Sequence, residues 1–463
     1  MQISLYNTRT RTKESWKPIN PADIKIYVCG PTVYAPPHIG NGRPIVVFDL
    51  LYRLLNLHYP KVTYVRNITD VDDKINQKAL ETGRSIQDIT TETIHFFHQT
   101  CEYLGARSPT VEPRVTDHIS EIIQMIQRLI EKDYAYENQG HVLFRVQKFK
   151  EYGQLSRKNQ DELLAGARIE VAPYKENAED FVLWKPSIAP TPGWDSPFGY
   201  GRPGWHIECS AMSAKHLGET FDIHGGGIDL VFPHHENEIA QSTACHDKLM
   251  ANVWMHNGHL SVNGQKMSKS LGNVVIIQDL MHQIHGQVVR WALLGSHYRQ
   301  PLDWTQELVH QSTAALNRLY TAVESLPCTE WEAEVDKTYI DEEILRALCD
   351  DLNTPLVAKR LHEIAHNINT ALSEDNKTYL QKILLNSARI IGFLTITPHE
   401  WFRGSLSSTA ITEEEVQKYL EQRNIAKIAK DFKTADAIRD TLKSKGIVIK
   451  DTPNGQEWQR ESS

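Results

Sequence analysis

The stretch IKIYVCGPTVYAPPHIGN, residues 24–41, decides the fold that we expect for this chain. Its first six residues read as a buried β-strand, and a Gly-Pro pair ends that strand. A proline-containing loop then leads through His38 into a helix with apolar residues spaced three and four apart, in which Pro44 fits the first turn. A second strand is expected over residues 62–69. This order predicts a right-handed βαβ unit, whose loops at the carboxyl ends of the strands usually bind nucleotides.

The loop after the first strand carries side chains suited to a triphosphate. His38 and Asn41 lie at the predicted helix N-terminus, where backbone N–H groups and the helix dipole favour phosphate oxygens. Between them, Gly40 has no side chain that would block a purine ring. A four-residue string of this kind also fits an ordinary surface loop, so it does not identify a nucleotide site by itself.

A second string, KMSKS at residues 266–270, points to the same chemistry. Lys266 and Lys269 lie on a loop between two glycines, and ammonium groups placed there can neutralise a pyrophosphate leaving group as the loop closes. A solvated lysine loop is the alternative interpretation. Because both strings occur in this order on the two halves of one expected sheet, together they favour activation of a substrate by a nucleoside triphosphate.

The second half of the sheet is expected to contain strands near 221–224 and at 253–255. Three glycines, 225–227, follow the first of these strands and would let a ligand approach the backbone, although they also fit a simple tight turn. We therefore expect Gly227 to contact ATP and Asp229 to accept hydrogen bonds from ribose hydroxyls.

Four side chains that are scattered in the sequence have the donor types of a metal site. They are Cys29, Cys209, His234 and Glu238. We expect Pro233 to open a helix on which His234 and Glu238 share one face, with His235 and Glu236 facing elsewhere. Two thiolates, one imidazole and one carboxylate suit zinc. Buried cysteines are also common as inert core residues, so both interpretations stay open at this point.

Composition sets wider limits. A chain of 463 residues predicts several domains, and a net charge of −8 argues against indiscriminate polyanion binding, so any nucleic-acid site must be local. Six scattered cysteines predict reduced thiols or metal ligands rather than a disulfide framework. We expect a cytoplasmic protein without a membrane segment, because the sequence has neither a signal-peptide pattern nor a run of about eighteen apolar residues.

The C-terminal part has a local excess of positive charge. Residues 416–460 contain ten Lys or Arg against six Asp or Glu, opposite to the whole-chain balance. Two helices and a hairpin with Asn454-Gly455 at its turn are expected there. With Trp458 available for stacking, single-stranded RNA is a candidate partner, and a solvated pair of amphipathic helices is the alternative.

The chain resembles the class I aminoacyl-tRNA synthetases, and specifically the cysteinyl-tRNA synthetase family, over nearly its full length. The resemblance is carried by six blocks, at residues 27–34 (YVCGPTVY), 38–41, 67–74 (NITDVDDK), 201–212, 224–238 and 266–273. It implies ATP-dependent activation of L-cysteine, with Mg-ATP as substrate, and transfer of the cysteinyl group to the 3′ end of tRNA(Cys). It also implies one zinc ion per chain, held by Cys29, Cys209, His234 and Glu238, beside a pocket formed by Thr69, Trp205 and His224.

The resemblance further implies the fold. We expect an α/β protein with a Rossmann-type parallel-sheet catalytic core, an inserted connective domain, an all-α helix bundle and a small α+β C-terminal module, acting as a monomer. The expected bounds are 1–95 and 196–305 for the halves of the catalytic domain, 96–195 for the insertion, 306–396 for the helical stem, 397–411 for a linker and 412–463 for the anticodon-binding module. In that module the expected tRNA contacts are Arg439, Asp451 and Trp458.

One residue departs from the usual class signature, which has a second histidine where this chain has Asn41. Asparagine donates a hydrogen bond but carries no charge, so more of the phosphate chemistry should fall to His38, Lys266 and Lys269.

Three alternative functions predict different sequence features. A cysteine ligase acting on an amino sugar would lack the C-terminal module, a zinc hydrolase would need the H-E-x-x-H spacing that residues 234–238 lack, and a noncatalytic RNA-binding relative would have lost the lysine loop or the metal ligands.

Overall fold

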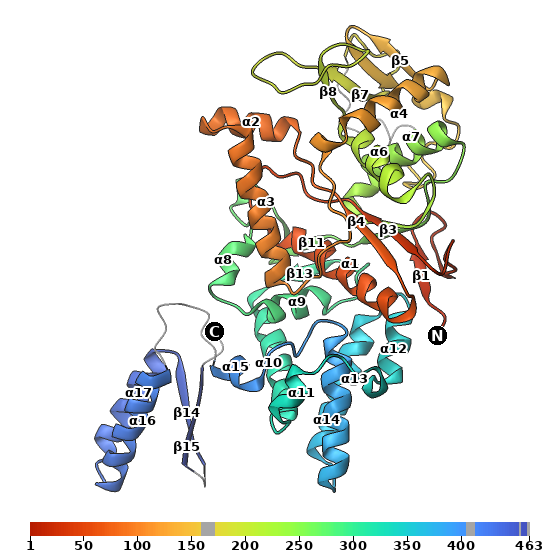
Figure 1. The fold of residues 1–463 in the computed structure, drawn as a ribbon. Helices are drawn as coiled ribbons and strands as arrows, with labels where there is room; N and C mark the ends of the chain where they lie inside the picture. The colour runs from red at the N-terminus through yellow and green to blue at the C-terminus, as the bar shows by residue number, and fades with distance from the viewer. Residues whose placement is uncertain (159–171, 404–412, 453–454, 461–463) are drawn as a thin grey trace.

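The computed structural model describes residues 1–158, 172–403, 413–452 and 455–460. At its centre lies a parallel sheet of four strands in the order β10-β9-β3-β4 (Figure 1). The strands are β3 (Ile24–Val28), β4 (Val62–Arg66), β9 (Phe221–Gly227) and β10 (Ala251–Asn257). Because β3 pairs with both β4 and β9, the two halves of the catalytic region form one sheet, as predicted. Strand β4 ends before the predicted residue 69, because Ile68 and Thr69 bridge to other segments.

Helix α1 (Ile39–His58) connects β3 to β4 and buries a continuous apolar face. It begins at Ile39, so Pro44 is its sixth residue, and the prediction that this proline lies in the first turn is wrong. The early start has a local cause. Asn41 Oδ1 accepts a hydrogen bond from the backbone N of His38 at 3.0 Å, which satisfies the N-cap residue and stabilises the first turn ahead of the proline.

Two helices, α2 (Asp73–Thr82) and α3 (Ile86–Tyr103), follow β4, and α3 packs against α1 and crosses the expected start of the insertion at residue 96. The rest of the insertion lies at one end of the core (Figure 1). Its elements are α4 (Ile119–Glu131) and an antiparallel sheet of β5 (Ala135–Asn138), β6 (His141–Phe144), β7 (Phe181–Pro186) and β8 (Gly201–Pro203). Strand β8 pairs with β7, so this sheet extends past the expected domain boundary at residue 195. Helix α6 (Trp205–Leu217) then returns the chain to the central sheet, where it carries Cys209.

Two small sheets flank the core. One is the hairpin of β1 (Ser4–Asn7) and β2 (Thr12–Ser15), and the other joins β11 (Leu260–Val262), β12 (Gln265–Lys266) and β13 (Leu302–Trp304). Helices α8 (Ile277–Met281) and α9 (Gly286–Leu294) lie between β12 and β13. The all-α bundle expected after residue 305 follows at the end of the core opposite the insertion (Figure 1). It contains α10 (Gln306–Ala322), α11 (Cys328–Glu332), α12 (Glu342–Cys349), α13 (Thr354–Asn369) and α14 (Glu374–Arg389).

The C-terminal module has the predicted two helices and hairpin. Its elements are α16 (Glu413–Ile428), α17 (Phe432–Ser444), β14 (Ile447–Thr452) and β15 (Gly455–Arg460). Part of the expected linker is helical, because α15 (Pro398–Arg403) packs beside α10, while residues 404–411 and Asn454 of the turn lie outside the described residues. Within the described parts of the chain, no helix is long and apolar enough to cross a membrane.

The three expected tRNA contacts have different surroundings. Trp458 is only 6% exposed and forms the core of the module with residues of α16, α17 and β14, so its ring lacks the open face that base stacking requires. That expectation is corrected: the indole stabilises the module. Asp451 is paired with Arg423 at 2.8 Å and Lys427 at 3.0 Å, and Arg439 with Asp436 at 3.0 Å.

Candidate active site

The site lies where the two halves of the sheet meet. Strands β3 and β9 are neighbours, and the backbone N of Cys29 donates to the carbonyl of Gly225 at 3.2 Å. The carboxyl ends of both strands therefore open at one edge of the sheet, where ligands of open α/β folds bind. All the loops discussed below converge on this edge.

The structure brings the four expected metal ligands together. Cys29 Sγ lies 3.7 Å from Cys209 Sγ and 3.4 Å from Glu238 Oε1, and His234 Nε2 lies 3.0 Å from that same oxygen. All four donor atoms lie within 4.8 Å of one another, and every ligand except the half-buried Cys29 is buried. Tetrahedral zinc with Zn–S bonds of about 2.3 Å places two sulfurs about 3.8 Å apart, so the donor set fits this ion.

The helix that carries Glu238 begins as predicted. Within the wide turn Val231–His235 only Phe232 has extended backbone angles (φ −142°, ψ 132°), so helical backbone starts at Pro233 and runs directly into α7 (Glu236–His246). The contact of His234 with Glu238, four residues on, forms as a result.

The two neighbours of His234 behave differently. Glu236 faces away from the cluster and accepts hydrogen bonds from the backbone N of Gly153 at 2.9 Å and of Ser156 at 2.8 Å. His235 does not face away, because its Nε2 lies 4.0 Å from Glu238 Oε1, and Cys29, His224, His235 and Glu238 form a second group of nearby donors. The prediction is confirmed for Glu236 and wrong for His235, since the wide turn rotates this ring inward.

A second layer of histidines orients the ligands. His206 Nδ1 lies 2.9 Å from His234 Nδ1, and His224 Nε2 lies 2.9 Å from Glu238 Oε2. The opposite atoms, His234 Nε2 and Glu238 Oε1, are thereby turned toward the two thiols. Outer partners of this kind fix ring and carboxylate orientation in metal sites.

Charge within the cluster is strongly redistributed. Burial would raise the pKa of Glu238, but the imidazoles of His224 and His234 hold it well below its ordinary value. Burial would lower the pKa of His234, but Glu238 and Cys209 raise it to about 10. The hydrogen bond from Cys29 lowers the pKa of Cys209 to about 6, whereas burial and the neighbouring Cys209 raise the pKa of Cys29 well above its usual value. A bound cation would therefore displace protons from this cluster.

The expected cysteine pocket surrounds the same cluster. Thr69 is buried, donates to Glu208 Oε2 at 3.4 Å and accepts from Asn67 Nδ2 at 3.1 Å. Trp205 is 39% exposed and stacks on His234 with ring centroids 4.2 Å apart. Sequence reasoning assigned no role to Asn67, His206 or Glu208, although each directly neighbours or nearly neighbours a residue that it did select.

The two sequence strings that predict a nucleotide site, residues 38–41 and 266–270, lie close together in the structure. Backbone hydrogen bonds from Ile39 N to Val275 O (2.8 Å) and from Ile277 N to Pro37 O (3.0 Å) fasten the segment after KMSKS to the loop before α1. A Cβ on Gly40 would lie 2.8 Å from Met267 Cε, so the KMSKS methionine packs directly on this glycine. Burial lowers the pKa of His38, and the nearby charge of Asp229 opposes that shift.

Asn273 stabilises the KMSKS loop through two hydrogen bonds. Its Oδ1 accepts from Ser268 N at 2.9 Å and its Nδ2 donates to the carbonyl of Lys266 at 3.3 Å. Lys266 is exposed at the end of β12, whereas the side chain of Lys269 lies outside what the structure describes.

The first two of the three glycines of β9 are explained by packing inside the protein. A Cβ on Gly225 would overlap Phe48, and one on Gly226 would meet His235. At Gly227 the nearest atom to such a Cβ is the carboxylate of Asp229, the residue expected to bind the ribose, so the prediction that Gly227 contacts ATP stays a prediction.

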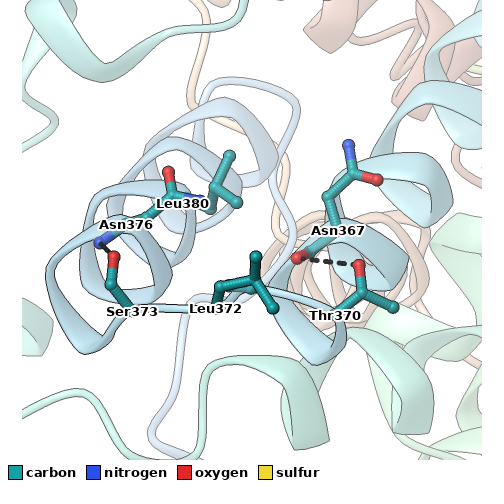
Figure 2. A pocket seen from close by; sticks show the side chains of 7 residues that line it. Asn367, Thr370, Leu372, Ser373, Asn376 and Leu380 are labelled. Carbon is teal, nitrogen blue, oxygen red and sulfur yellow. Dashed lines mark hydrogen bonds between the residues drawn. The ribbon is translucent and has the colours of Figure 1, made fainter.

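A separate hollow lies away from this edge. Figure 2 shows it at the turn between α13 and α14, lined by Asn367, Thr370, Ala371, Leu372, Ser373, Asn376 and Leu380, with a volume of about 390 Å³. Its hydrogen bonds, Thr370 Oγ1 to Asn367 O and Asn376 N to Ser373 Oγ, belong to the helix ends themselves. It offers no group suited to the chemistry discussed here.

Substitutions of Asn41 can separate its effect on protein stability from its effect on ATP binding. We expect Asn41→Ala to lower the free energy of unfolding by about 1 kcal/mol, because the His38 N–H loses its acceptor. Asn41→Asp keeps an acceptor and should retain stability, yet its negative charge would oppose the triphosphate and raise the KM for ATP. Urea unfolding and ATP titration of both variants check this. Equal stability of the two variants would contradict the capping role.

Sequence comparison identifies the class and then the family. The family described as tRNA synthetases class I (C) catalytic domain matches residues 15–314, the DALR domain matches 344–395 and the Cysteinyl-tRNA ligase anticodon binding domain matches 412–458. With the fold and the two joined nucleotide strings, these matches define a class I aminoacyl-tRNA synthetase. The chain is 51% identical over 466 residues to the Cysteine--tRNA ligase of Rhodospirillum rubrum, covering 99% of this chain and 100% of that relative. It belongs to the cysteinyl-tRNA synthetase family.

Other relatives agree. The Cysteine--tRNA ligase of Saccharophagus degradans is 47% identical over 463 residues, covering 99% of this chain and 100% of the relative. Among solved structures, methionyl-tRNA synthetase of Mycobacterium tuberculosis in complex with methionyl-adenylate has a TM-score of 0.57 at 16% identity, covering 80% of this chain and 89% of that chain. The LeuRS of Agrobacterium radiobacter K84, in a ternary complex with tRNA, has a TM-score of 0.58 at 11% identity, covering 83% and 85%. At these identities the two structures support the fold alone.

Proposed function

We propose that this protein joins L-cysteine to the 3′ end of tRNA(Cys), with Mg-ATP as substrate and one zinc ion per chain. The observation that carries the proposal is the buried cluster of Cys29, Cys209, His234 and Glu238 beside the joined nucleotide strings. A site that selects a thiol therefore adjoins a site suited to phosphate chemistry, and the family of the chain agrees with both.

Activation requires an in-line displacement at the α-phosphorus of ATP. A carboxylate oxygen of cysteine forms the new O–P bond, the bond between Pα and the bridging oxygen breaks, and pyrophosphate leaves with that electron pair. His38 and Asn41 at the start of α1 would hold the phosphates, with Gly40, Gly227 and Asp229 shaping the ATP site. Lys266 and Lys269 would stabilise the charge on the leaving group.

The thiol side of the site explains selection against serine. When bound, zinc would hold the substrate sulfur as a thiolate, whereas a serine hydroxyl is harder and far less acidic. The four ligands would hold the ion through the donor atoms described above, while His224, Thr69 and Trp205 wall the pocket. Loss of a metal bond costs much more than loss of a methylene contact, so selection needs no separate editing domain.

Transfer of the cysteinyl group requires contact with tRNA(Cys). We assign this contact at the anticodon to residues 412–463, with Arg439 and Asp451 as candidate contacts on the module surface and Trp458 in its core.

The other expected domain bounds are kept, with the insertion extended through β8. A cytoplasmic location and a monomeric state complete the proposal, and sedimentation of the purified protein tests the latter.

Cysteine-dependent exchange of labelled pyrophosphate into ATP tests the first step. We expect exchange with cysteine, little exchange with serine, and loss of exchange when a chelator removes the metal, with recovery on adding zinc. Charging of purified tRNA(Cys) tests the second step. Exchange with another amino acid would overturn the assignment, and cysteine exchange combined with transfer to an amino sugar instead of tRNA would favour the sugar ligase.

A further inference from the structure

Behind the metal cluster lies a buried hydroxyl that the chemistry above does not use. Tyr27 of β3 is 0% exposed, and its Oη has no hydrogen-bond partner among the described residues. A buried hydroxyl left without a partner costs about 1–3 kcal/mol, so such groups call for an explanation. Its ring packs against His224, with centroids 5.2 Å apart, which holds the side chain in place.

Position on the strand directs this hydroxyl toward the cluster. Tyr27 and Cys29 are two residues apart on extended chain and so face the same side of the sheet, the side that α6 covers. Tyr27 and Cys209 belong to one buried cluster of packed side chains.

In the metal-free structure the Cys29 thiol donates to the sulfur of Cys209 at 3.7 Å, but Cys29 would lose this proton on binding a metal. Another polar side-chain neighbour of the sulfur is Asn67 Oδ1, also at 3.7 Å. This oxygen already accepts from Gly30 N at 2.9 Å, which fixes the orientation of the amide with its oxygen toward the sulfur. A carbonyl oxygen can accept from a thiol but cannot donate to a thiolate. The donor that a metal-bound thiolate needs must therefore come from another group.

We propose that the Tyr27 hydroxyl donates a hydrogen bond to the Cys209 thiolate when the metal is bound, and that this makes Tyr27 a positioning residue that tunes the cysteine-selective site. The inference rests on the proposed function. A hydrogen bond to a ligand sulfur draws electron density from the metal–thiolate bond, which strengthens the attraction of the ion for a further, substrate thiolate. The hydroxyl thus acts through Cys209 and does not touch the substrate.

Tyr27→Phe removes this hydroxyl alone. The variant should fold, because the change deletes a buried polar atom that has no partner in the metal-free protein. We expect its affinity for Co(II), used as a spectroscopic probe, to fall about tenfold, with a shift of the sulfur-to-cobalt charge-transfer band. Tyr64→Phe is the matched control, because Tyr64 is equally buried on the adjacent strand β4 but packs against Tyr52, and it should bind like the wild type.

A double-variant cycle separates the hydrogen bond from a packing effect. In a Cys209→Ser background, which should bind metal more weakly and is therefore measured at saturating Co(II), Tyr27→Phe should have no further effect on the Co(II) affinity or spectrum, because the sulfur on which it acts is gone. Wild-type affinity and spectrum for Tyr27→Phe, or an unchanged effect in the Cys209→Ser background, would overturn the inference. If the wild-type protein itself bound no Co(II) or Zn(II), the proposed function would fail first, so the two failures are distinguishable.

Discussion

Cys209→Ser is expected to reduce cysteine-dependent pyrophosphate exchange by about a thousandfold or more in kcat/KM, equivalent to roughly 4 kcal/mol of transition-state stabilisation. Cys209 Sγ lies 3.7 Å from Cys29 Sγ and belongs to the buried donor set. A serine hydroxyl does not ionise at neutral pH and is a harder ligand, so the site would lose much of its affinity for zinc and its preference for a thiol. Exchange assays and metal analysis of the same samples measure both effects.

Cys245→Ser provides the control for this substitution. Cys245 is also buried, lies on α7 and has no place in either donor group. It should retain zinc and nearly full exchange activity. Stoichiometric zinc together with normal selection of cysteine over serine in Cys209→Ser would contradict the assigned ligand set.

Lys269→Ala is expected to slow formation of the adenylate by about a hundredfold to a thousandfold while leaving the metal content unchanged. The expected reason is electrostatic. The Ile39–Val275 and Ile277–Pro37 hydrogen bonds join the segment after KMSKS to the start of α1, so under the proposed function the charge of Lys269 would act on the leaving pyrophosphate. The metal cluster is built from other segments and does not depend on this loop.

Single-turnover measurement of adenylate formation tests this expectation. The effect should appear mainly in the rate of the chemical step rather than in the KM for cysteine, because the ammonium acts on charge that develops in the transition state. Lys248→Ala is the control, since Lys248 is an exposed lysine paired with Glu219. A variant at 269 that keeps its rate but loses cysteine affinity would show that the loop acts on the amino acid instead.

Much of the fold could be predicted from local patterns. The apolar run over 24–29 and the three-and-four spacing after it identified β3 and α1. The strand predicted near 221–224 is present, but β9 continues through the three glycines to Gly227. One error lies where a side-chain contact overrides local preference, because Asn41 starts α1 ahead of Pro44. The start of a helix at Pro233, after the extended Phe232, agrees with the prediction.

The burial of individual side chains was the property hardest to predict from the sequence. Trp458 was expected to be available to RNA because an aromatic residue in a basic segment suits stacking, but it packs between the helices and the hairpin of its module. His235 was expected to face away on a regular helix, but a wide turn brings it within 4.0 Å of Glu238. For Trp458 the decisive contacts come from other elements, and His235 also contacts His256 of β10 at 2.8 Å.

The sequence by itself determined the parallel αβ core, the two nucleotide strings and the kinds of donor atom available for a metal, because each depends on short-range spacing or on residue chemistry. Only the tertiary structure decided that Cys29, at the end of β3, meets Cys209 of α6 and Glu238 of α7. Pairing of β3 with β9 joins segments about 200 residues apart, and no local pattern specifies that junction. The second layer of histidines and the buried Tyr27 hydroxyl follow from the same long-range packing.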